Sequence, residues 1–147
     1  MPNAFVATAI DRAVSMNRSW LAVRAAESKQ ARDIIALDVR QATSFADYFV
    51  ICSGTNSRQI QAIADAVDER LEALGLRVTH AEGYKQAEWV LLDYVDFVVH
   101  VFSEQARKFY DLERLWKSAR RMAPEELKAG RTRTRIAATA APRKKRA

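Results

Sequence analysis

An almost wholly apolar run followed at once by an amphipathic pattern is the feature that most restricts the fold of this chain. Residues 48–54 read YFVICSG, and continuous apolarity over so short a segment is typical of a strand in the middle of a sheet. Apolar residues then recur at spacings of three and four, which predicts a helix with one apolar stripe made of Ile60, Ile63, Ala64, Val67, Leu71 and Leu74. Strand, loop and helix in this order form a βα unit.

The ends of this helix carry their own signals. Asn56 is a suitable N-cap, and Gln59 is placed to return its side chain to the cap. Gly75 stands where a left-handed C-cap is expected.

The remaining elements follow from composition and periodicity. We expect a first helix over residues 20–32, then strands over 33–39, 76–80 (weak), 88–94 and 97–103. Only Val95-Asp96 separates the last two strands, which predicts an antiparallel hairpin whose turn lacks the usual glycine. A final helix over 104–121, capped by Ser103, would place Phe109, Leu112, Leu115 and Trp116 on its inner side; Pro124 ends it or begins a short further helix.

The order α-β-β-α-β-β-β-α predicts an α/β or α+β domain in which helices flank a mixed sheet of about five strands. At 147 residues one domain is expected, large enough to bury a core without metals or disulfides. A disulfide framework is excluded because Cys52 is the only cysteine.

Charge divides the chain into unequal parts. Residues 117–147 hold 11 Lys and Arg against 2 Glu, a net charge of +9, whereas residues 1–116 hold 13 against 16, a net charge of −3. From Ala129 onward the sequence lacks periodicity and acids, which is typical of disorder. We therefore expect an N-terminal extension (1–19), a folded domain (20–122) and a basic, disordered tail (123–147).

The N-terminal residues bear on where in the cell the protein is located. It has no secretory signal and no apolar run long enough to cross a membrane, so we expect a cytoplasmic protein. Because this stretch is rich in Ala and poor in acids, an organellar transit peptide is the alternative reading.

The sequence gives little support for a catalytic or metal-binding site. Cys52 lies inside the apolar run and His100 inside a predicted strand, so both read as core residues, although a pair on neighbouring strands stays open. The single glycine of the Ser53–Ser57 loop is not a phosphate-binding motif, and two carboxylates alternating along a strand are missing. We expect no cofactor and no metal.

Acidic and aromatic residues gather around the predicted hairpin. Such a mixture suits contact with a basic protein and repels bare nucleic acid. Trp89 is the expected anchor, although a core position is an equal alternative. The expected contact residues are Glu82, Tyr84, Trp89, Asp93, Tyr94 and Asp96.

The tail carries cations without interleaved aromatic residues. This pattern fits salt-sensitive attraction to a phosphate backbone rather than base reading, with a solubilising terminus as the alternative. The cations are Arg131, Arg133, Arg135, Arg143, Lys144, Lys145 and Arg146.

Four blocks together resemble a known family. They read DIIALDV, ADYFVICSGTNSRQIQAIADAV, EGYKQAEWVLLDYVDFVVHVF and ARKFYDLERLW, and in order and spacing they resemble the ribosomal silencing factors, the Iojap-related proteins, over about residues 20–118. One departure is Val95, where the family pattern usually has glycine before Asp96.

The resemblance implies a nucleotidyltransferase-like fold without catalytic carboxylates, and a translation repressor rather than an enzyme. It implies binding to the large ribosomal subunit through ribosomal protein number fourteen, which blocks joining of the small subunit. The resemblance also implies that the chain can pair into a homodimer. A nucleotide-binding enzyme and a basic-tailed RNA-binding module are the two rival readings.

Overall fold

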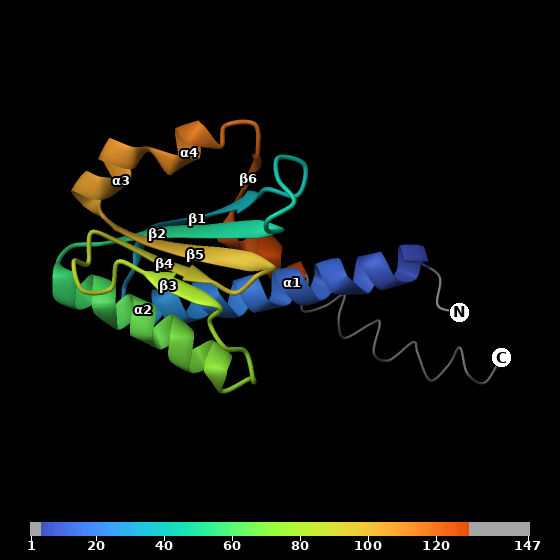
Figure 1. Ribbon diagram of the computed structural model, residues 1–147, viewed down its shortest axis with the longest axis horizontal. Helices are drawn as coiled ribbons and strands as arrows, with labels where there is room; N and C mark the ends of the chain where they lie inside the picture. Colours follow the sequence, from blue (N-terminus) through green and yellow to red (C-terminus); the bar gives the residue numbers. More distant parts are fainter. Residues whose placement is uncertain (1–3, 130–147) are drawn as a thin grey trace.

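A computed structural model describes residues 4–129 (Figure 1). Six strands form one sheet in the order β3-β4-β5-β2-β1-β6, in which only β2 and β5 run parallel. The strands are β1 (Arg32–Asp38), β2 (Tyr48–Gly54), β3 (His80–Glu82), β4 (Trp89–Asp93), β5 (Phe97–Ser103) and β6 (Arg120–Met122). This confirms the predicted mixed sheet, with one strand more than expected.

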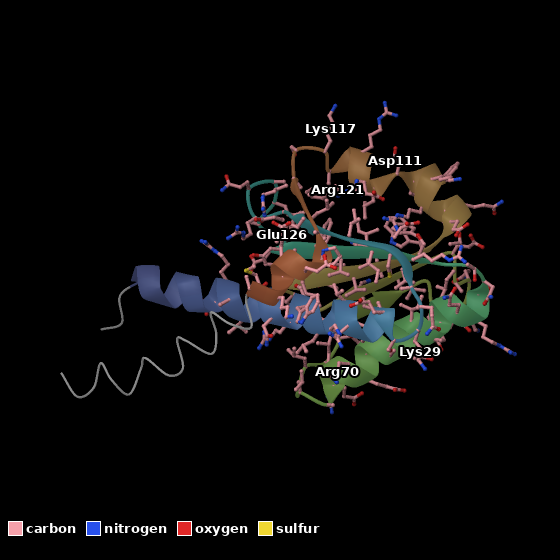
Figure 2. All side chains as sticks on the ribbon, turned by 180° about the vertical axis from the view of Figure 1, so that it is seen from behind. Lys29, Arg70, Asp111, Lys117, Arg121 and Glu126 are labelled. Carbon is pink, nitrogen blue, oxygen red and sulfur yellow. The ribbon has the colours of Figure 1, made fainter. Side chains whose placement is uncertain are left out.

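Helices cover both faces of this sheet. The helices are α1 (Ala4–Glu27), α2 (Ser57–Glu72), α3 (Glu104–Tyr110), α4 (Leu112–Leu115) and the 3-10 helix η1 (Pro124–Leu127). Figure 1 shows α1 and α2 below the sheet and α3 and α4 above it. Figure 2, seen from behind, places Lys29 and Arg70 on the first side and Asp111, Lys117 and Arg121 on the second.

The βα unit forms as the sequence predicts. Every residue of β2 is buried, because the strand pairs with β5 on one side and β1 on the other and an apolar cluster covers each of its faces. The Asn56 side chain accepts a hydrogen bond from the backbone N–H of Gln59, and Gly75 has a φ of +83°. Two details differ: Gln59 Oε1 accepts from Thr55 rather than Asn56, and Leu74 is 57% exposed because the helix ends at Glu72.

The hairpin of β4 and β5 is confirmed, with Trp89 opposite Phe102 and Asp93 opposite Val98. Its turn has Val95 at a φ of +76°, a backbone conformation that β-branched residues rarely adopt. The weak strand expected over 76–80 is shifted to His80–Glu82.

The predicted helix over 104–121 is wrong in its length. It breaks at Asp111, whose φ of +45° and ψ of +56° are left-handed, and the chain returns to pair as β6 beside β1. Ser103 does cap α3, since its Oγ accepts from the N–H of Ala106. Because of the break, Leu112 is buried and Trp116 half-buried, but Phe109 and Leu115 are 82% and 74% exposed rather than facing inward.

The folded part is longer at both ends than residues 20–122. Helix α1 runs continuously past residue 19, and Ser15, Met16 and Ser19 are buried. At the other end, Leu127 of η1 is fully buried in the core between the sheet and α1. In residues 4–129, no helix is both long and apolar enough to cross a membrane.

Candidate functional site

Two apolar clusters lie on opposite faces of the sheet. The first packs between the sheet and α1, α2 and η1, and includes Cys52, Val90 and Leu92. The second lies under α3 and α4 and includes Phe49, Ile51 and Phe102. Since side chains alternate along a strand, neighbouring residues of β4 belong to different clusters.

The second face is covered at one end only. Along β4, Val90 and Leu92 are buried beneath the helices, whereas Trp89, Leu91 and Asp93 on the other face are half-buried. All of β3 is exposed, and the register sets His80 opposite Asp93 and Glu82 opposite Leu91. We call this surface the open face; its residues are His80, Glu82, Trp89, Leu91 and Asp93.

The indole of Trp89 lies where the open face meets helix α3. Its ring stacks on Phe102 and leans on Tyr110, with ring centroids 4.9 Å apart in both pairs. Its Nε1 donates a hydrogen bond to Nδ1 of His100 over 3.1 Å. Trp89 is therefore half-buried: part of the ring packs on the core and the rest reaches the surface.

Exposed aromatic side chains of α3 extend the open face. Tyr110 is 51% exposed and Phe109 is 82% exposed, with their rings 5.1 Å apart. They border a hollow of about 660 Å³ together with Glu88 and Lys108. Sequence reasoning missed these two because helical spacing alone assigned Phe109 to the interior, and the break at Asp111 removes that spacing.

Carboxylates give the open face its charge. Glu82 and Asp93 lie on it and Glu88 at its edge, and the acid of Glu82 pairs with His80 over 3.1 Å. Asp93 Oδ1 accepts from the N–H of Val95, which fixes the side chain at the hairpin turn. The predicted combination of Trp89, Asp93 and Glu82 thus lies on one surface.

The other three predicted contact residues lie elsewhere. Tyr94 is 3% exposed on the face covered by helices, and its hydroxyl donates to Asp68 of α2, so it belongs to the core rather than to a contact surface. Burial, with the nearby Asp68 carboxylate, raises its pKa well above the usual range. The hydroxyl of Tyr84 likewise donates to Asp65 of α2.

Asp96 lies at the turn and pairs with Arg18 of α1 over 3.2 Å. Burial raises the pKa of this carboxyl although Arg18 opposes the shift. Its role in the structure is to tie the hairpin turn to α1. The tail cations predicted to contact RNA, Arg131 to Arg146, lie outside the described residues.

A Cys–His nucleophilic pair is ruled out by the register. Cys52 lies in the cluster under α1 and α2, whereas His100 is opposite Ile51 and points to the other face. Burial raises the pKa of the Cys52 thiol to about 12 and lowers the pKa of His100 to about 3. Neither group is in a state suited to catalysis at neutral pH.

The loop between β2 and α2 has its polar groups engaged within the protein. Ser53 Oγ accepts from Arg107, whose Nε donates to Glu113 over 2.9 Å. Asn56 caps α2, and Gln59 accepts from Thr55. In the described part of the chain, no group of three or more His, Cys, Asp or Glu residues is arranged to hold a metal ion.

Comparison with known proteins gives a consistent result. Residues 14–147 match the family described as "Ribosomal silencing factor during starvation". The ribosomal silencing factor RsfS of Bacillus subtilis is 43% identical over 99 residues, which cover 67% of this chain and 84% of that protein. The chloroplastic protein Iojap of Zea mays is 34% identical over 96 residues, 65% of this chain and 42% of that one.

Solved structures agree with the fold as well. A crystal structure of a Chromobacterium violaceum protein superposes with a TM-score of 0.67 at 38% identity and covers 68% of this chain and 83% of that one. Sequence and fold therefore confirm the resemblance drawn from the four sequence blocks. The chain belongs to the ribosomal silencing factor family, whose members are regulators of translation that act in association with the ribosome.

Proposed function

We propose that this protein represses translation by binding the large ribosomal subunit through ribosomal protein number fourteen, and that it thereby blocks joining of the small subunit. The proposal rests on the family resemblance and on the open face. The observation that carries it is the half-buried row of Trp89, Leu91 and Asp93 on β4, next to the fully exposed strand β3.

The chemistry of the open face suits a basic protein partner. Aromatic side chains surrounded by polar ones are typical of the energetic centre of an interface, and Trp89 with Tyr110 and Phe109 supplies them. The carboxylates of Glu82, Glu88 and Asp93 attract cations and repel the phosphates of bare RNA. This favours a ribosomal protein over ribosomal RNA as the occupant of the face.

Repression by this route needs no bond to be made or broken. The bound protein occupies surface that the small subunit must reach, so its effect depends on concentration and affinity alone. We therefore propose a binding protein without enzymatic activity. The engaged polar groups around Ser53 and Arg107 support this reading over a nucleotide-binding enzyme.

Co-sedimentation with separated large and small ribosomal subunits tests the proposal. We expect binding to the large subunit only, and we expect Trp89→Ala to weaken it about 30-fold, the effect of losing an interface anchor. Glu82→Lys is a second variant that leaves the fold intact, since the Glu82 side chain is 66% exposed, and it should also weaken binding.

Tyr84→Ala is the matched control, because it removes an exposed aromatic ring on the α2 side of the sheet. We expect it to bind like the unaltered protein. Full binding by both Trp89→Ala and Glu82→Lys would contradict the assignment of the open face. Sedimentation of the protein alone measures self-association, which the exposed apolar side chains of the same face would favour.

We propose a separate, weaker role for the basic tail, namely salt-sensitive attraction to ribosomal RNA. Removal of residues 129–147 should weaken large-subunit binding modestly. It should also reduce the slope of log affinity against log salt concentration. An unchanged slope would contradict contact between these cations and phosphates.

A further inference from the structure

His100 is buried in aromatic surroundings on the side of the sheet that carries Trp89. It is 3% exposed on β5, between β2 and β4. Its ring centroid is 4.9 Å from Phe49, 5.9 Å from Trp89 and 6.2 Å from Phe102.

The hydrogen bond to Trp89 fixes the protonation of the imidazole. An indole nitrogen can only donate, so Nδ1 of His100 must hold a lone pair and the ring proton must be on Nε2. That Nε2 is buried and has no hydrogen-bond partner in the described structure. An unpaired buried donor lowers the stability of the folded protein, so an imidazole at this position is unfavourable for stability.

What the His100 imidazole contributes is a fixed orientation of the Trp89 indole. Its Nε1 is bonded to His100, and the ring lies against Phe102 and Tyr110, so the indole is held from three directions. A half-buried tryptophan without such a bond can turn about its side-chain torsions, and an interface then has to order it on binding.

We propose that His100 is a positioning residue for partner binding: its Nδ1 accepts the Trp89 Nε1–H and holds the indole in the orientation that the partner contacts. This rests on the proposed function of the open face. His100 itself touches no partner, since it is enclosed by Phe49, Trp89 and Phe102.

His100→Phe removes the acceptor and keeps a ring of similar size. We expect this variant to bind large ribosomal subunits about five- to tenfold more weakly than the unaltered protein, the effect of one neutral hydrogen bond. Its stability should not fall, because the unpaired Nε2–H is removed as well. A purely structural role for His100 would give the opposite pattern, with lower stability and unchanged affinity.

A double-mutant cycle with Trp89→Phe tests whether His100 acts through the indole N–H. We expect the double variant to bind no more weakly than Trp89→Phe alone, because the single change already removes the donor. His100→Asn places its Oδ1 near the position of Nδ1 and should restore most of the affinity.

Nuclear magnetic resonance supplies a readout that does not depend on the ribosome. The indole N–H signal of Trp89, identified by its loss in Trp89→Phe, should shift and exchange faster with solvent in His100→Phe. Unchanged affinity in His100→Phe, a loss that adds to that of Trp89→Phe, or an unchanged indole signal would each overturn the inference. Failure of the proposed function is distinguishable, since it would appear as absent large-subunit binding by the unaltered protein, or as full binding by both Trp89→Ala and Glu82→Lys.

Discussion

At the scale of single residues, Val95 combines a β-branched side chain with a backbone that such residues avoid. Its φ is +76°, and the N–H of Asp96 donates to the carbonyl of Tyr94 across it, which makes a tight three-residue turn. The side chain is 62% exposed and so gains little from packing.

We predict that Val95→Gly raises the free energy of unfolding by about 1 kcal/mol. Relief of the strained φ is worth about 1–3 kcal/mol, and the added freedom of glycine in the unfolded chain offsets part of it. Urea denaturation measures the difference. Val95→Ala is the control, because it shortens the side chain but keeps a Cβ; if it stabilised the protein as much as glycine does, backbone strain would not be the cause.

His100 gives stability a pH dependence. Burial lowers its pKa to about 3, against an ordinary value of 6.5. Below pH 6.5 the imidazole of His100 therefore binds a proton in the unfolded chain but not in the folded chain. The free energy of unfolding consequently falls as the pH falls.

We expect the imidazole to contribute a slope that approaches about 1.4 kcal/mol per pH unit below its ordinary pKa. Denaturation at pH 6 and pH 5, above the range in which most carboxyls titrate, measures it. His100→Phe should lose this part of the slope. The same slope in both proteins would show that other groups are responsible.

At the scale of elements, the connection from β3 to β4 decides where Trp89 lies. Gly83 has a φ of +82°, and a Cβ there would be 2.0 Å from the backbone carbonyl oxygen of Trp89. Gly75, after α2, has almost the same φ, but a Cβ there would meet nothing within 4 Å. A comparison of substitutions at the two glycines therefore distinguishes the effect of backbone strain from that of a steric clash.

We predict that Gly75→Ala lowers the free energy of unfolding by about 1–2 kcal/mol, the effect of a left-handed backbone alone. Gly83→Ala should lower it by at least about 1 kcal/mol more, since the backbone of β4 must also move. It should also weaken large-subunit binding, because the displaced strand carries Trp89. Equal losses of stability in the two variants, by urea denaturation, would contradict this account.

At the scale of the whole molecule, α1 ties the hairpin turn to the core. Ser15, Met16 and Ser19 are buried, and Arg18 pairs with Asp96 at the turn between β4 and β5. The helix therefore belongs to the folded body on both sides of residue 19.

We predict that removal of residues 1–19 lowers the free energy of unfolding by several kcal/mol, since part of the first core cluster is lost. Met16→Ala tests the same point with the helix kept whole and should lower it by about 2 kcal/mol. Thermal or urea unfolding measures both. Unchanged stability in both variants would mean that residues 1–19 do not contribute to the stability of the folded core.

The local parts of the fold were predictable because they follow from neighbouring residues. The apolar run of β2, the stripe of α2 with its Asn56 cap, and the short spacing of β4 and β5 each lie within a few residues of sequence. Trp89, Asp93 and Glu82 could be grouped for the same reason, since all lie in one short stretch.

The open face and the aromatic residues beside it were only half predictable. Tyr94 is one residue from Asp93, yet it faces α2 because the two side chains alternate across β4. Phe109 and Tyr110 join the surface only because Asp111 breaks the helix, and a helical spacing in the sequence does not reveal that break.

The sequence by itself therefore determined the elements near its centre, the mixed sheet and the family, because these depend on periodicity and on local residue order. Only the tertiary structure decided which face of β4 stays open, that Arg120–Met122 completes the sheet beside β1, and that His100 meets Trp89. Those features depend on contacts between segments far apart in the chain. A local sequence pattern does not reveal the energies of such contacts.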